Sequence, residues 1–233
     1  MFFLIFHLTF ERGIFKILTV RLKNFGQVSY RFPFLVQVGR KVVLLAFQFR
    51  FDKTLQAAGM FLRLNGGSMT YLRLLKLLYL ADRQCLAVEG DTITGDRARA
   101  MPKGPVLRTT YNLIKRLDSQ SPRWHRFIKS GEDFSVFVAE DPGTDDLCRF
   151  EKEIIEQVYH QYRDVHAFDL IDLTHEFPEW KKYEKRLKDP KQRKSYPISI
   201  KEMLDGLKKP EMIERVRQNI AAERFHRELF NNQ

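Results

Sequence analysis

Several side chains that could hold a metal ion lie close together in the C-terminal half of the chain. Asp172 and His175 stand three residues apart, with Asp169 one turn earlier and Glu179 shortly after. A tetrahedral site needs three or four convergent ligands, but the sequence has no HExxH motif, and a proline ends the expected helix before Glu179. In the alternative interpretation, the aspartates stabilise the positive end of the helix while His175 and Trp180 pack locally. We expect no bound metal and no cofactor.

Nucleophilic chemistry has as little support in the sequence. Cys85 and Cys148 lie in helical patterns and outside CxxC spacing, and the predicted neighbours of Cys85 on its helix face are apolar. No serine stands in a GxSxG motif, and Gly66-Gly67 lacks the Lys-Ser/Thr that completes a phosphate loop. The residues therefore favour a binding module over an enzyme, with a hydrolase that uses the His175 region as a weaker alternative. Two cysteines without a pairing pattern indicate a reducing, cytoplasmic compartment.

Lys76 stands inside the most apolar segment of the chain, residues 71–90. We expect its methylene groups to pack in the core while its ammonium reaches the surface or a carboxylate such as Asp96. In the alternative, Arg73, Lys76 and Arg83 form a basic stripe that contacts an acidic partner protein.

The net charge of +11 raises the question of nucleic-acid binding, and its distribution matters more than its sum. Residues 1–51 carry +7 and residues 181–194 carry +6, so the rest of the chain carries −2. The stretch 181–194 is the best nucleic-acid candidate, because Tyr183 and Tyr196 could stack on bases. The alternative is a solvated loop. The net charge of −2 on the rest of the chain favours this alternative, because the body of the protein is not basic. The basic residues named as possible partner contacts are Arg73, Lys181, Lys182, Lys185 and Arg186.

The first fifty-one residues have an unusual composition. They hold eleven of the twenty phenylalanines and one acidic residue. The first ten residues are apolar but too few to span a bilayer, and we expect no membrane association. Residues 34–49 are compatible with a strand or an interfacial segment. We interpret 1–51 as an extension, which a translation start assigned too far upstream would explain, and place one domain over 52–230.

Apolar periodicity and capping residues define the expected elements of that domain. Thr70 caps a long central helix that ends at Gly90, and Ser199 caps a short helix near the C-terminus. The expected helices cover 52–64, 71–90, 105–117, 144–163, 167–177, 199–207 and the chain from 210 onward, and 124–139 is expected to form a β-hairpin. The predicted fold class is α+β and predominantly α-helical, with one central buried helix and a small antiparallel sheet.

The order of several motifs along 52–207 resembles the Panacea domain, the SocA-like antitoxin family of bacterial toxin–antitoxin systems. The motifs are LNGGSMTYLRLLKLLYLADRQCL (64–86), GDTITGD (90–96), MPKGPV (101–106) with Tyr111, THEFPEW (174–180) and Pro197-Ile198. Residues 1–50 have no counterpart in this pattern, and 181–194 is longer and more basic than expected.

The resemblance implies an antitoxin, bacterial or from a phage, that neutralises a cognate toxin by direct contact. The toxin would be encoded by a neighbouring gene. Some members of the family resemble adaptors that deliver a toxin to an ATP-dependent protease, and no catalytic residues carry over. The family-motif positions, with a structural or partner-binding role, are Lys76, Tyr79, Asp82, Arg83, Gly95, Asp96, Gly104, Pro105, Val106, Tyr111, His175 and Trp180.

Overall fold

A computed structural model describes residues 6–8, 18–22, 25–30 and 45–230 of the chain. The chain divides into two units, Met1–Val43 and Leu44–Gln233. In the first unit, β1 (Phe6–Leu8), β2 (Leu18–Leu22) and β3 (Phe25–Tyr30) form an antiparallel sheet in that order. Most of the segment 34–49, for which a strand or an interfacial segment was expected, lies outside the described residues.

The second unit, called the compact unit below, begins upstream of the boundary expected at Asp52. Phe47 is only 6% exposed and belongs to the hydrophobic core. Arg50 forms ion pairs with Asp91 and Glu223, and its backbone amide donates to the Thr94 carbonyl. Residues 45–51 are thus part of the domain, because Phe47 packs into its core and Arg50 pairs with its acidic residues.

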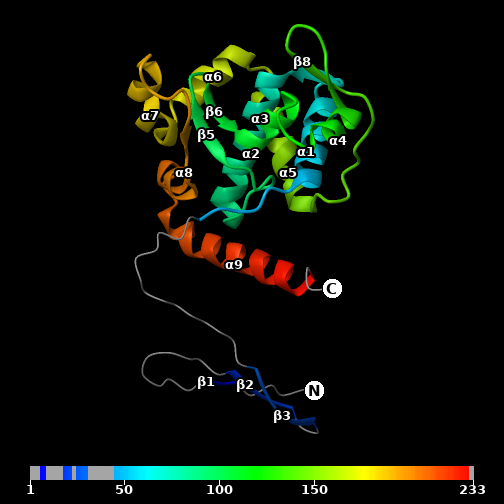
Figure 1. The fold of residues 1–233 in the computed structure, drawn as a ribbon, viewed down its shortest axis with the longest axis vertical. Helices are drawn as coiled ribbons and strands as arrows, with labels where there is room; N and C mark the ends of the chain where they lie inside the picture. The colour runs from blue at the N-terminus through cyan, green and yellow to red at the C-terminus, as the bar shows by residue number, and fades with distance from the viewer. Residues whose placement is uncertain (1–5, 9–17, 23–24, 31–44, 231–233) are drawn as a thin grey trace. The chain divides into compact units, whose positions relative to one another are not determined.

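The compact unit is predominantly helical and has two small antiparallel sheets, which confirms the predicted fold class (Figure 1). Its helices are α1 (Phe51–Leu64), α2 (Tyr71–Glu89), α3 (Arg108–Ile114), α4 (Ser121–Phe127), α5 (Arg149–Tyr162), α6 (Ala167–His175), α7 (Pro178–Lys188), α8 (Ile200–Gly206) and α9 (Ile213–Phe230), with the 3-10 turn η1 (Pro210–Met212) before α9. Its strands are β4 (Ser68–Thr70), β5 (Ala98–Met101), β6 (Gly104–Leu107), β7 (Ile128–Ser130), β8 (Ser135–Val138) and β9 (Tyr196–Pro197).

Helix α2 is the central, buried element, as predicted. The Thr70 hydroxyl accepts a hydrogen bond from the Arg73 amide at its start, and Gly90 ends it in the left-handed conformation. Helices α1, α5, α6 and α8 all contact α2. In Figure 1, α1 and α5 lie on one side of α2, and α7 and α8 lie beyond its other side. Twelve residues of α2 are buried, which explains why its apolar surface extends around most of the helix.

Each sheet of the compact unit has three strands. One has the strand order β4-β8-β7, and its β7–β8 hairpin confirms part of the hairpin expected over 124–139, although Trp124 belongs to α4. The other has the order β6-β5-β9, with Ala100 opposite Pro105. The helix expected over 105–117 is present as α3, but its predicted start is wrong, because Pro105 lies in the edge strand β6, where a missing amide hydrogen costs no ladder bond.

Three other expected elements differ in position. Asp52 lies in the first turn of α1 rather than at its cap, because the helix begins at Phe51. Helix α5 begins at Arg149, after an irregular segment that contains Thr144. The basic stretch predicted as a loop forms most of α7, because Trp180, Tyr183 and Leu187 supply an apolar helix face.

Helix α9 lies mostly at the surface, since Val216 and Ile220 are its buried residues. Among the described residues, no helix combines the length and the apolar content that crossing a bilayer requires.

Candidate functional site

The family-motif residues gather where α2 meets the β5–β6 hairpin and helices α6 and α7. Lys76 of α2 is 0% exposed, and its ammonium donates a hydrogen bond to the Pro105 carbonyl oxygen at 2.8 Å. Gly104 has φ +88° at this point, and a Cβ there would clash with Lys76 Nζ and Thr174 Oγ1. Glycine at 104 therefore lets the hairpin approach α2 closely enough for Lys76 to reach its backbone.

The structure contradicts the placement expected for Lys76. Its ammonium reaches neither the surface nor Asp96, and no carboxylate pairs with it among the described residues. Burial lowers the pKa of Lys76 from 10.5 to about 7. The amine is thus only partly protonated at neutral pH, and because it is fully buried it cannot contact an acidic partner at the surface.

Glu179 connects α7 to α2 from the N-terminal end of α7. Its side chain is fully buried, and Oε1 accepts from Tyr79 Oη at 2.9 Å and from Arg83 Nε at 2.7 Å. The Arg83 guanidinium also lies 4.1 Å from the centroid of the Phe177 ring. Burial, and then the Glu179 charge, raise the pKa of the Tyr79 phenol well above 10. The sequence suggested Glu179 as a metal ligand, but the structure shows it as the hub of a buried hydrogen-bond network.

His175 and Trp180 stack on each other with ring centroids 3.7 Å apart. Trp180 Nε1 donates to the Met101 carbonyl at 2.9 Å, which ties α7 to β5. Burial, and then the nearby Lys76, lower the pKa of His175 below its usual 6.5. Asp172, the partner considered for a metal site, is exposed on α6. This geometry agrees with the local packing interpretation of His175.

The remaining motif positions organise the segment between α2 and α3. The Asp82 carboxylate is buried and accepts from the Thr94 amide at 3.0 Å and from the Thr94 hydroxyl. Burial raises the pKa of Asp82 to about 7, and the Thr94 hydrogen bonds oppose that shift. Gly95 leaves no room for a side chain, because a Cβ would overlap the Gln48 carbonyl. Asp96 accepts from the Thr109 and Thr110 amides at the start of α3.

Val106 and Tyr111 complete the motif set without a polar role in the described structure. Val106 is 5% exposed in the core, and Tyr111 is partly buried against it, with the Arg108 guanidinium 5.8 Å from its ring centroid. The motif positions as a group are thus buried or half-buried, so they hold elements together and offer little surface to a partner.

Arg73 and Arg83 do not form the solvent-facing basic stripe considered from the sequence. The Arg73 guanidinium donates to the carbonyls of Tyr162 and Arg163, both at 2.8 Å, and to that of Val165. It therefore caps the C-terminal end of α5, where carbonyl groups lack helical partners. Because Arg73 is 8% exposed and Lys76 fully buried, the predicted stripe lies inside the domain.

The four basic residues of α7 that were considered as partner contacts are all exposed. Lys181 pairs with Glu176 at 2.6 Å, and Lys182 pairs with Glu202. Lys185 and Arg186 are exposed. Tyr183 and Tyr196, considered as stacking platforms for bases, instead stack on each other with ring centroids 5.3 Å apart. Their faces are thereby used within the fold, which weakens the case for nucleic acid at this surface.

Metal-binding residues do not converge in the part of the chain that the structure describes, where no group of three or more His, Cys, Asp or Glu side chains could hold an ion. Cys85 is buried and Cys148 exposed, and both thiols are free. Burial raises the pKa of the Cys85 thiol, which makes it a poor nucleophile.

Comparison with known proteins gives one family match. No curated protein and no solved structure matches the chain. The model of the family described as antitoxin SocA-like, Panacea domain, matches residues 74–181, from the first turns of α2 to the first turn of α7. This range is narrower than the resemblance over 52–207, but it contains the whole buried network described above. Residues 74–181, somewhat less than half of the chain, therefore match the Panacea domain of the SocA-like antitoxin family.

Proposed function

We propose that this protein is an antitoxin that neutralises a cognate toxin by direct, non-catalytic binding in the cytoplasm. The observation that carries the proposal is the family match over residues 74–181. The cytoplasmic assignment is supported by the free, exposed thiol of Cys148, which suits a reducing compartment.

The use made of the polar side chains supports binding over catalysis. A catalytic site needs a nucleophile or base within reach of a substrate, and a second group that orients it. Here Lys76, Tyr79 and Glu179 are buried and bonded to one another or to the backbone. His175 is packed against Trp180. These groups stabilise one arrangement of helices, and a binding module needs its surface held in one shape.

A titration distinguishes a binder from an enzyme. The probe is the purified product of the open reading frame next to the gene for this chain, with its toxic activity held constant. A binder must occupy its target, so protection should saturate near equimolar antitoxin, and the two proteins should co-purify. The intact mass of the toxin should be unchanged afterwards.

Two outcomes would contradict the proposal. One is full protection at a small fraction of equimolar antitoxin, and the other is loss of protection in a His175→Ala variant that remains folded by circular dichroism. A protease adaptor would protect at a small fraction of equimolar antitoxin only when an ATP-dependent protease and ATP are present. This requirement separates the adaptor mechanism from a simple binder and from an enzyme.

A further inference from the structure

A surface pocket lies beside the β7–β8 hairpin, away from the buried motif network. Its volume is about 520 Å³, and Tyr71, Lys115, Arg116 and Phe134 are among its lining residues. We call these four residues with the space between them the Phe134 pocket. They come from the start of α2, the C-terminal end of α3 and the hairpin turn, so three separate elements build the site.

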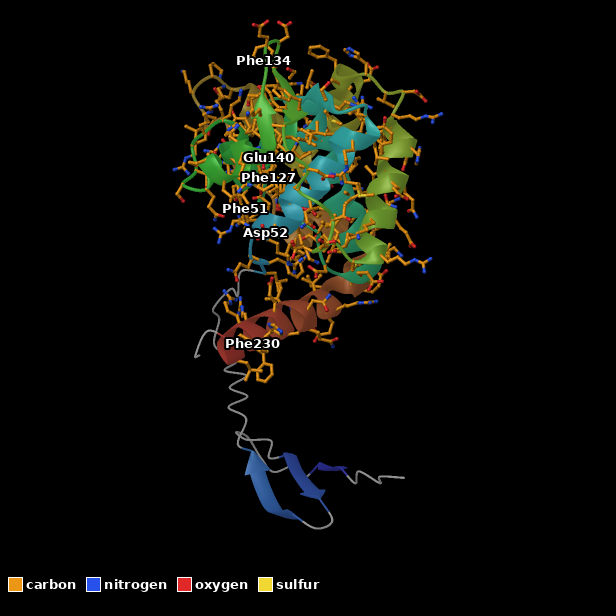
Figure 2. All side chains as sticks on the ribbon, turned by 90° about the vertical axis from the view of Figure 1, so that its right-hand side faces the viewer. Phe51, Asp52, Phe127, Phe134, Glu140 and Phe230 are labelled. Carbon is orange, nitrogen blue, oxygen red and sulfur yellow. The ribbon has the colours of Figure 1, made fainter. Side chains whose placement is uncertain are left out.

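Phe134 is held outward on a strained turn. Its side chain is 72% exposed, and Figure 2 shows it at the outer tip of the hairpin. Phe134 has φ +61° and Asp133 has φ +51°, a conformation that is rare for a bulky residue and costs free energy. The Phe134 carbonyl accepts from the Tyr71 amide at 2.9 Å, which fixes the turn to α2. The fold thus maintains an exposed aromatic ring in a fixed position.

Two basic residues, Lys115 and Arg116, line the pocket together with this ring. Lys115 and Arg116 follow α3, and neither forms an ion pair in the described part of the chain. Lys115 Nζ lies 3.9 Å from the centroid of the Tyr71 ring and 6.0 Å from that of Phe134. Tyr71 and Phe134 meet edge to face with centroids 6.1 Å apart. An apolar surface and unpaired positive charge therefore lie within one contact area.

We propose that the Phe134 pocket binds a segment of the partner toxin in which an acidic side chain lies beside an aromatic or aliphatic one. The carboxylate would pair with Lys115 and Arg116, and the apolar side chain would pack on Phe134 and Tyr71. Aromatic residues and arginine are enriched in protein–protein interfaces, and Phe134, Tyr71 and Arg116 supply both kinds here. Lys115 and Arg116 outweigh Asp133 among the charged residues that line the pocket, so the lining carries a net charge of +1, which suits a single carboxylate better than a polyanion such as nucleic acid. This inference rests on the proposed function, because it names the surface through which neutralisation occurs.

The test compares pocket variants with matched controls by calorimetric titration against the same purified toxin. Phe134→Ala and Lys115→Glu should each weaken binding by roughly tenfold or more, as expected for hot-spot residues. The matched controls are Phe168→Ala, another exposed phenylalanine at 62%, and Lys185→Glu on α7. Both controls should bind like the wild type.

A third variant separates the side chain from the strain that presents it. Phe134→Gly relieves the left-handed backbone, so its melting temperature should equal or exceed that of the wild type while binding is still lost. For Lys115→Glu, an Asp→Lys or Glu→Lys substitution in the toxin should restore binding. Such a suppressor requires a direct charge contact.

The outcomes separate the pocket from the function. If the wild type binds the toxin and Phe134→Ala, Phe134→Gly and Lys115→Glu bind it equally well, the pocket is not the binding site. The proposed antitoxin function would then still stand. A wild-type chain that neither binds the toxin nor protects against it would overturn the function and the pocket together.

Discussion

Lys76→Met tests whether the central helix confines an ammonium inside the protein. The side chain is fully buried, and its hydrogen-bond partner is the Pro105 carbonyl oxygen. Burial lowers the pKa of Lys76 to about 7, whereas the unfolded chain keeps the ordinary value of 10.5. Between these two pKa values the unfolded state holds the proton and the folded state releases it. Stability therefore rises with pH in this window, because the unfolded state binds more protons.

The size of the effect follows from the two pKa values. Between pH 7 and pH 9 the free energy of unfolding should rise by about 2 kcal/mol on account of Lys76. Below pH 7 both states become protonated and the contribution levels off.

Other shifted groups act mainly outside this window. The pKa of Asp82, raised to about 7, makes stability fall as pH rises from 3.8 towards 7 and has little effect above that. The lowered pKa of His175 acts below 6.5, and the raised pKa of Cys85 acts from about 9 upward.

The assay is urea unfolding of the wild type and of Lys76→Met at pH 7, 8 and 9, followed by circular dichroism. The wild type should gain stability across this series, and the methionine variant should stay level. Lys185→Met, at an exposed position of α7, should follow the wild type. Equal slopes for the wild type and Lys76→Met would refute the assignment of a confined, deprotonating amine at this site.

Two further predictions concern the boundary and the close packing of the domain. Removing residues 1–43 should leave the unfolding free energy of the compact unit unchanged. Removing residues 1–50 should lower it by about 3–5 kcal/mol, because the buried Phe47 is then lost. Identical melting temperatures of the two truncated proteins would show that 44–50 lies outside the core. Gly104→Ala should cost more than about 2 kcal/mol, because its Cβ clashes with Lys76 Nζ. Gly66→Ala, with a similar φ but open space around it, should cost about 1 kcal/mol, and equal costs by chemical denaturation would contradict the packing argument.

The elements predicted well from the sequence are those whose ends carry their own signals. Thr70 and Gly90 cap α2 by local hydrogen bonding and local backbone conformation, so a reader of the sequence can place both. The same holds for α8, where Ser199 and Glu202 form a capping box. Such signals are complete within a few residues and need no knowledge of the tertiary structure.

The missed elements depended on context or on a weak signal. Pro105 suits the first turn of a helix and also an edge strand, and the pairing of β6 with β5 decides between them. For α7 the apolar spacing of Trp180, Tyr183 and Leu187 was available, but the density of lysine and arginine obscured it. In that helix the charges lie on the solvent side and the apolar residues on the other.

The sequence indicated which residues belong to the candidate site, but it did not indicate how they are arranged in space. The motifs named Tyr79, Arg83 and the segment containing Glu179, yet Tyr79 and Glu179 are one hundred residues apart in the chain. No local pattern shows that their side chains meet, or that Lys76 turns inward to the hairpin backbone. No sequence pattern indicates the Phe134 pocket, because its residues come from three separate elements. Two of these residues, Arg116 and Phe134, also adopt left-handed conformations that their residue types do not favour.

The inward position of the motif residues limits what a family match can reveal about a partner. Lys76, Asp82 and Glu179 lie within the matched range and hold helices and loops together inside the fold, so they offer no surface to a partner. Recognition then falls to surface residues outside the motif, such as Lys115 and Phe134. The two groups should behave differently when mutated: substitutions in the buried network should lower stability and toxin binding together, whereas substitutions in the Phe134 pocket should lower binding alone. A surface variant that loses both in proportion would mean that the hairpin is a structural support of the core and that recognition lies elsewhere.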